Sequence, residues 1–160
     1  MLNVTLLTVG KLKEAYWRAA CEEYEKRLGA FCKANIVEVE EFRLPAKPSQ
    51  AQIDAGLEAE GKRLLEQIPA GSYVITLCIE GKELSSTQLA ERLAGVAVQG
   101  YSRVVMVIGG SFGLSPAVKA RSDLRLSMSP MTFPHQMARV MVLEQLYRAL
   151  GINAGTKYHK

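Results

Sequence analysis

A loop braced by two prolines runs directly into a long apolar helix near the C-terminus, and this stretch most constrains the fold. It reads LSMSPMTFPHQMARVMVLEQLYRAL and spans residues 126–150. Proline disfavours the helical conformation of the residue before it, so Ser129-Pro130 and Phe133-Pro134 predict an extended, stiff loop. Pro134 suits the first turn of a helix because its missing N–H costs nothing there, and no helix breaker follows before Leu150. We expect a rigid loop that is held at the start of a helix.

Apolar side chains surround this predicted helix. At ~100° per residue, the polar residues between 135 and 150 are scattered around its circumference instead of sharing one arc. Such a helix must be buried on more than one side. Because one sheet of a 160-residue chain cannot cover it fully, we expect a second copy to pack on it in a homodimer. The alternative is a central helix that is sandwiched within one subunit.

Length and composition predict one globular domain over residues 1–160. The chain is 48% hydrophobic, and no linker or repeat divides it. No apolar run approaches the ~20 residues that span a bilayer, and no basic region precedes the apolar N-terminal segment, so we expect neither a membrane span nor a signal peptide. Three cysteines without metal-ligand spacing indicate a reduced, cytoplasmic protein with no metal site.

Charge is distributed unevenly along the chain. Residues 1–100 carry 12 Lys+Arg against 14 Asp+Glu, a balance of −2, whereas residues 101–160 carry 8 against 2, a balance of +6. This asymmetry favours a polyanionic partner, such as nucleic acid, for the C-terminal third. The alternative is an ordinary solvated basic surface.

Strand and helix patterns alternate along the sequence. The predicted strands are residues 3–9, 36–39, 73–79, 103–108 and 124–127, and the predicted helices are residues 13–28, 52–68, 85–98, 116–122 and 134–150. Ser85 with Gln88 has the pattern of a capping box, and Ser115-Pro116 is typical of a helix start. Residues 40–50 are expected to form a loop. The alternation predicts an α/β fold with a mostly parallel sheet that is covered on both faces.

Three loops follow predicted strands and are the expected place for a site. They are CIEGKE (78–83), GGSFG (109–113) and SPMTFP (129–134), and ligands of open α/β sheets bind beyond the carboxyl ends of the strands. Gly109, Gly110 and Gly113 would let the backbone approach a ligand, although a simple tight turn explains them equally well. The spacing is neither GxGxxG nor GK[ST], which disfavours a dinucleotide fold or a phosphate loop.

His135 and Arg139 lie one helical turn apart and project from the same face. The positive end of the helix dipole disfavours an imidazolium, so we expect His135 to be neutral and able to accept a proton. A histidine at a helix start is also commonly a surface or hydrogen-bonding residue, and that alternative stays open here.

Four segments closely resemble the small ribosomal RNA pseudouridine methyltransferases of the SPOUT superfamily. They are VITLCIEGKELSS (74–86), VIGGSFGLSP (107–116), SMSPMTFPHQMARVMVLEQLYRA (127–149) and the terminal YHK (158–160), and TVGKLK (8–13) agrees as well. The resemblance implies a Rossmann-like parallel sheet whose C-terminal part, about residues 104–150, forms a deep trefoil knot. Such a knot departs from the general rule against threaded chains.

The resemblance further implies a homodimer that binds S-adenosylmethionine with its knot loops. The corresponding positions are Leu77, Gly109, Met128, Ser129, Pro130, Met131, Thr132 and Phe133. Cys78 stands where we expect relatives often to carry an acidic residue, which affects one polar contact near the cofactor.

The implied reaction is methyl transfer from S-adenosylmethionine to N3 of a pseudouridine in 23S ribosomal RNA, within the large subunit or the assembled ribosome. Alignment of donor and acceptor would supply the larger part of the rate. His135, Tyr158 or His159 would accept the N3 proton, and Arg139 would stabilise charge on the base or hold a phosphate. The rival hypothesis is a ribosome-associated RNA-binding protein without catalysis. A nucleotide-binding α/β enzyme is a weaker third possibility.

The last six residues, 155–160, would ordinarily be expected to fray. Tyr158 is able to stack on a base, however, the imidazole of His159 can transfer a proton, and Lys157 and Lys160 attract phosphate. We therefore expect this tail to complete the active site that the partner's cofactor loops form.

Overall fold

The computed structural model describes residues 1–160, in which five strands alternate with five helices. The elements are β1 (Asn3–Val9), α1 (Ala15–Leu28), β2 (Lys33–Val39), α2 (Gln50–Glu66), β3 (Tyr73–Glu83), α3 (Ser86–Val98), β4 (Arg103–Ile108), α4 (Pro116–Arg121), β5 (Leu124–Ser127) and α5 (His135–Asn153). The predicted α/β alternation is confirmed.

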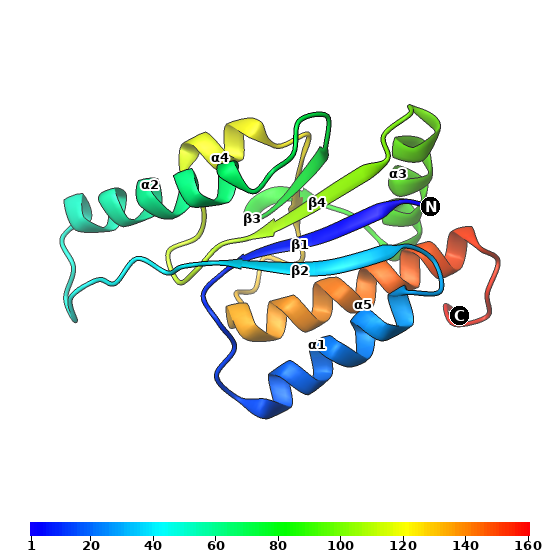
Figure 1. The fold of residues 1–160 in the computed structure, drawn as a ribbon, viewed down its shortest axis with the longest axis horizontal. Coiled ribbons are helices and arrows are strands. Elements are labelled where there is room, and N and C mark those ends of the chain that lie inside the picture. Colours follow the sequence, from blue (N-terminus) through cyan, green and yellow to red (C-terminus); the bar gives the residue numbers. More distant parts are fainter.

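The strands form one sheet in the order β2-β1-β4-β3-β5, and every neighbouring pair is parallel. Figure 1 shows α2 and α4 on one side of this sheet and α1 and α5 on the other. Because all strands are parallel, their carboxyl ends lie at one edge, and the loops that leave this edge are close in space.

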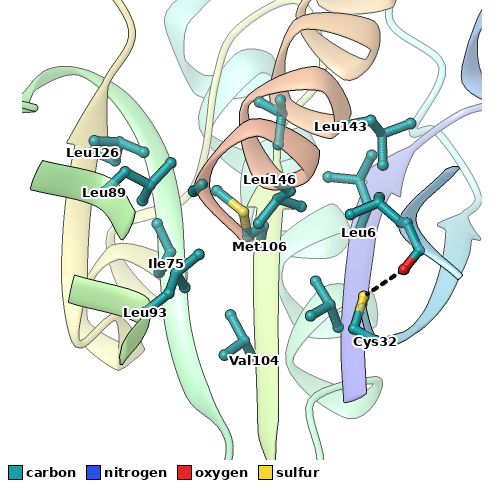
Figure 2. Close-up of a cluster of buried hydrophobic side chains, with 14 of the residues drawn as sticks. Leu6, Cys32, Ile75, Leu89, Leu93, Val104, Met106, Leu126, Leu143 and Leu146 are labelled. Carbon is teal, nitrogen blue, oxygen red and sulfur yellow. Dashed lines mark hydrogen bonds between the residues drawn. The ribbon is translucent and has the colours of Figure 1, made fainter. Parts of the chain in front are cut away.

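Side chains that alternate along each strand build a core on each face of the sheet. On one face, Leu6 of β1 and Met106 of β4 pack against Leu143 and Leu146 of α5, as Figure 2 shows. On the other face, Val107 and its neighbours pack against α2 and α4. Burial on both faces explains why residues 104–108 of β4 are all apolar.

Helix α5 is covered on several sides within the one chain. Val142, Leu146 and Ala149 are buried against the sheet. On the α1 side, the Tyr147 ring lies 5.7 Å from the Phe31 ring, and on the α3 side Ser86 donates a hydrogen bond of 2.6 Å to Gln145. Packing inside one subunit therefore accounts for most of the apolar circumference, which alone is not a reason for a dimer.

Local capping signals placed the helix starts well. Ser85 and Gln88 form the predicted capping box of α3, and the Ser115 side chain accepts from the Val118 N–H at the start of α4. A second capping box, Ser49 with Gln52, begins α2 two residues earlier than predicted, although its pattern is visible in the sequence.

The prediction of a loop at residues 78–83 was wrong. Strand β3 continues to Glu83, and its register against β5 shifts between Leu77 and Lys82. Gly81 makes this pairing possible, because an added Cβ would lie 2.7 Å from the Arg125 carbonyl oxygen. The absence of a side chain at Gly81 thus extends the sheet where the sequence suggested that it ends.

Candidate active site

A cavity of about 630 Å³ lies at the carboxyl ends of β4 and β5 and the middle of β3, beside the start of α5. Its walls come from residues 77–79 of β3, the glycine loop 109–113, the loop 128–134 and the first turn of α5. The volume falls in the ~300–1,000 Å³ range of small-molecule sites, and half of the lining residues are hydrophobic. This edge of the sheet is where the sequence predicted a site.

Most of the residues expected to hold a cofactor line this cavity. They are Leu77, Gly109, Met128, Ser129, Met131, Thr132 and Phe133, whereas Pro130 is not part of the lining. Sequence reasoning did not single out Ile108 and Leu126 on the strands or Gln136 and Ala138 on α5. Their positions near the ends of the predicted strands and the start of the predicted helix could have indicated that they line the site.

The glycine loop folds tightly on itself. The Gly113 N–H donates to the Gly110 carbonyl at 3.1 Å, and Gly113 has a φ of +84°. A Cβ on Gly109 would lie 2.2 Å from the Gly113 oxygen, whereas one on Gly110 would meet no atom closer than 3.6 Å. Gly109 is therefore required for the closure of the loop. Its expected role in admitting a ligand to the backbone stays a prediction.

Hydrogen bonds and prolines brace the loop before α5. The Ser129 hydroxyl accepts from the Met131 N–H at 3.0 Å, and the Ser127 hydroxyl donates to the Ser129 carbonyl at 3.2 Å. Residues 128–134 contain no helix or strand, in agreement with the predicted extended loop. The loop thus forms a fixed wall of the cavity.

His135 lies in the cavity wall at the first residue of α5. Burial lowers the pKa of its imidazole below the usual value, and the nearby Arg139 charge lowers this pKa further. Its Nδ1 atom is buried and has no hydrogen-bond partner. The structure therefore favours the neutral imidazole, a form that is able to accept a proton.

Arg139 is buried instead of facing a substrate. Its side chain is 1% exposed, Nη1 donates to Glu38 Oε2 at 2.7 Å, and Nη2 donates to the carbonyls of Val9 and Gly10 at 2.9 Å each. These contacts hold the guanidinium inside the fold, which disfavours the expected contact of Arg139 with a phosphate or the reacting base. Arg139 instead ties the start of α5 to the ends of β1 and β2.

Replacing Arg139 with Met should destabilise the fold by roughly 3 kcal/mol, because Glu38 and two carbonyls lose their donor. Because the Glu38 side chain is 33% exposed, we expect a loss of stability at the lower end of the range that is typical when a buried ion pair is broken. Urea denaturation measures the change in the free energy of unfolding. Glu38→Gln retains an acceptor for Arg139 and should cost less. If Arg139→Met unfolds at the same urea concentration as the wild type, the ion pair of Arg139 with Glu38 does not stabilise the fold.

The C-terminal tail packs on the far half of α5 and not on this cavity. The Tyr158 hydroxyl donates to Glu144 Oε1 at 3.1 Å, and His159 Nδ1 lies 3.1 Å from Arg148 Nη1. Glu144 is nine residues after His135, which is about 14 Å along a helix. Burial and hydrogen bonding raise the pKa of Tyr158, so it is a donor here rather than a base. One chain does not bring all four predicted catalytic residues together.

Ion pairs use much of the positive charge of the C-terminal third. Lys119 pairs with Glu80 at 2.6 Å and Arg121 with Asp123 at 3.4 Å, and Arg139 and Arg148 are also paired. Half of the eight basic side chains are therefore engaged within the fold. The basic surface is smaller than the sequence suggested.

A parallel α/β sheet with a cavity between a glycine loop and a proline-braced loop is typical of α/β proteins that bind small molecules. Comparison with known proteins shows the family to which the chain belongs. Residues 2–159 match the family described as "Predicted SPOUT methyltransferase". The chain therefore belongs to the SPOUT methyltransferase family.

Curated relatives resemble the chain over its full length. A protein of Bifidobacterium adolescentis is 49% identical over 99% of this chain and 100% of its own length, and one of Clostridioides difficile is 46% identical over the same shares. Both carry the name "Ribosomal RNA large subunit methyltransferase H". A solved structure of a probable methylase family protein from Haemophilus influenzae has a TM-score of 0.52 at 13% identity, over 99% of this chain and 70% of that one, and shows the fold alone.

None of the helices combines the length and the apolar character that crossing a membrane requires.

Proposed function

We propose that this protein transfers a methyl group from S-adenosylmethionine to N3 of a pseudouridine in 23S ribosomal RNA. The observation that carries the proposal is the cavity between loops 109–113 and 128–134 in a chain of the SPOUT methyltransferase family. Relatives 44–49% identical are named for methylation of large-subunit ribosomal RNA. The proposal places the protein in the cytoplasm, with the ribosome as its substrate.

The residues of the cavity fit S-adenosylmethionine. Leu77, Met128 and Phe133 offer apolar surface for an adenine ring, and the glycine loop offers backbone groups. The start of α5 lacks a side-chain cap, which leaves backbone N–H groups that suit the carboxylate of the cofactor. When bound, this cofactor supplies a methyl group that its sulfonium already activates.

The protein's own part in the reaction is to align the acceptor and to remove a proton. The braced loop and the glycine loop fix the cavity walls, so donor and acceptor are held in line. His135 is a neutral imidazole in the wall and is suited to accept the N3 proton. Arg139 ties the start of α5, which carries His135, to β1 and β2, and its charge lowers the pKa of the imidazole.

The proposal includes a homodimer and a knotted C-terminal region. Three large apolar side chains are exposed in this region: Ile79 and Met131 line the cavity, and Met137 is next to lining residues of α5. Their exposure supports a partner subunit that covers them. In this dimer the tail of one subunit would reach the cavity of the other. Membership of the SPOUT family supports a deep trefoil knot over about residues 104–150.

A ribosome-associated RNA-binding protein without catalysis is the rival function. Such a protein needs basic surface for phosphates, but it has no use for a half-hydrophobic cavity of this volume. The cavity therefore favours the enzyme.

Calorimetry with S-adenosylmethionine is the first test, and saturable binding with one site per chain is expected. Purified large subunits or ribosomes should then accept labelled methyl groups, whereas a short isolated hairpin should not, because phosphate contacts position a substrate without specifying its sequence. Absence of cofactor binding would refute the enzymatic function. Equal turnover on the hairpin would refute the need for a large structured RNA.

A further inference from the structure

A basic and aromatic segment follows β1 and has no role in the site described so far. Residues 11–18 read KLKEAYWR and carry three basic side chains against one acidic. Lys11 and Lys13 are exposed, and neither takes part in any of the five ion pairs. Tyr16 is 65% exposed, and its ring lies 5.2 Å from that of Trp17.

The backbone of this segment is held in place from both sides. Arg18 Nη1 donates to the carbonyls of Leu12 and Lys13, at 2.9 Å and 2.6 Å, so the cation of α1 braces the loop. On the other side, the Gly10 carbonyl accepts from buried Arg139. The side chains of Lys11 and Lys13 therefore project from a fixed backbone, which lowers the entropy cost of binding a partner.

Arg139 also fixes where the segment lies relative to the cavity. It stands one helical turn after His135, which is in the cavity wall, and it contacts Gly10 directly. Figure 1 shows the start of α1 close to the start of α5, at the edge where the strands end. Glu41, near Gly10, limits the basic surface on the β2 side. The segment is thus beside the cavity, on the side of α1.

We propose that residues 11–18 dock the substrate RNA beside the cavity, with Lys11 and Lys13 on phosphates and Tyr16 stacked on an unpaired base. This inference rests on the proposed function for the identity of the partner. Unpaired cations attract the backbone whatever its sequence, and an exposed aromatic ring offers a stacking surface to any base. Since half of the C-terminal basic residues are paired, these two lysines supply free positive charge where the RNA must approach.

The test measures binding of large ribosomal subunits over a range of salt concentrations, without cofactor. The double variant Lys11→Ala with Lys13→Ala should bind more weakly at low salt, and the slope of log affinity against log salt should fall by about 2. Tyr16→Ala should weaken binding about tenfold with an unchanged salt slope, whereas Tyr16→Phe should bind normally.

A matched control removes the same charge elsewhere. Lys26, in the last turn of α1, and Lys33, at the start of β2, are exposed and lie at the opposite edge of the sheet. Lys26→Ala with Lys33→Ala should leave the affinity unchanged. Calorimetry with S-adenosylmethionine verifies that each variant retains its fold and cofactor site.

Three results would overturn the docking role. The first is that the Lys11 and Lys13 double variant binds ribosomal subunits with the affinity and salt slope of the wild type. The second is that the Lys26 and Lys33 control variant loses as much affinity as the Lys11 and Lys13 variant. The third is a shift to smaller species in sedimentation of the Tyr16 or lysine variants, which would assign the segment to a contact between two copies of the chain. If the wild type binds subunits but transfers no methyl group, the proposed function fails while docking is still tested.

Discussion

Deletion of Tyr158–Lys160 should abolish methylation of ribosomes while leaving cofactor affinity nearly unchanged. The tail is anchored on α5 by Glu144 and Arg148, about 14 Å or more along the helix from His135, so it does not line the cavity of its own chain. In the proposed dimer it completes the partner's site. Methyl incorporation into ribosomes and calorimetry with S-adenosylmethionine measure the two effects separately.

Mixed dimers test this arrangement directly. A tail-deleted subunit combined with a Gly109→Val subunit should regain activity, because one intact tail then meets one intact cavity. Tyr158→Phe is a milder control that removes the hydrogen bond to Glu144 and keeps the ring contact with Tyr147 at 4.8 Å. Normal methylation by the truncated protein would remove the tail from catalysis. Inactive mixed dimers, formed from parents that dimerise, would disprove a site shared between subunits.

Replacing Gly109 with Val should eliminate detectable binding of S-adenosylmethionine. The new Cβ would lie 2.2 Å from the Gly113 oxygen and 2.5 Å from the Gly113 carbonyl carbon, so the loop must open, and the cavity wall moves with it. Backbone atoms cannot rotate away as a flexible side chain would, so even Gly109→Ala should bind poorly. Calorimetry measures the affinity, and circular dichroism verifies the fold.

Gly110→Ala is the matched control for this loop. An added Cβ there would lie 3.6 Å from a Val9 methyl group and 3.7 Å from Glu60 Oε1, which are ordinary contact distances. This variant should therefore bind S-adenosylmethionine almost normally. If Gly109→Val also binds the cofactor normally, the glycine loop does not shape the site, and if Gly110→Ala binds as poorly as Gly109→Val, the distinction based on loop closure is wrong.

Local sequence patterns determined the elements and the place of the site. β1, β4 and β5 have their predicted bounds because apolar, β-branched runs between breakers have few other solutions in a short chain. The helix starts at Ser85 and Ser115 depend on hydrogen bonds to the next turn. Parallel strands place the loops after them at one edge, so the glycine loop and the loop before α5 were predictable neighbours.

Tertiary structure alone decided the roles of individual side chains. Arg139 bonds to Val9 and Glu38, which are 130 and 101 residues away in the chain, and no local pattern specifies such a partner. Similarly, Lys119 finds Glu80 across the fold, and Gly109 meets the backbone of Gly113 only after the loop has turned. A short-range pattern fixes conformation because the interacting atoms are neighbours in sequence. The pairing of a buried charge depends instead on which distant group the packed fold places within hydrogen-bond reach.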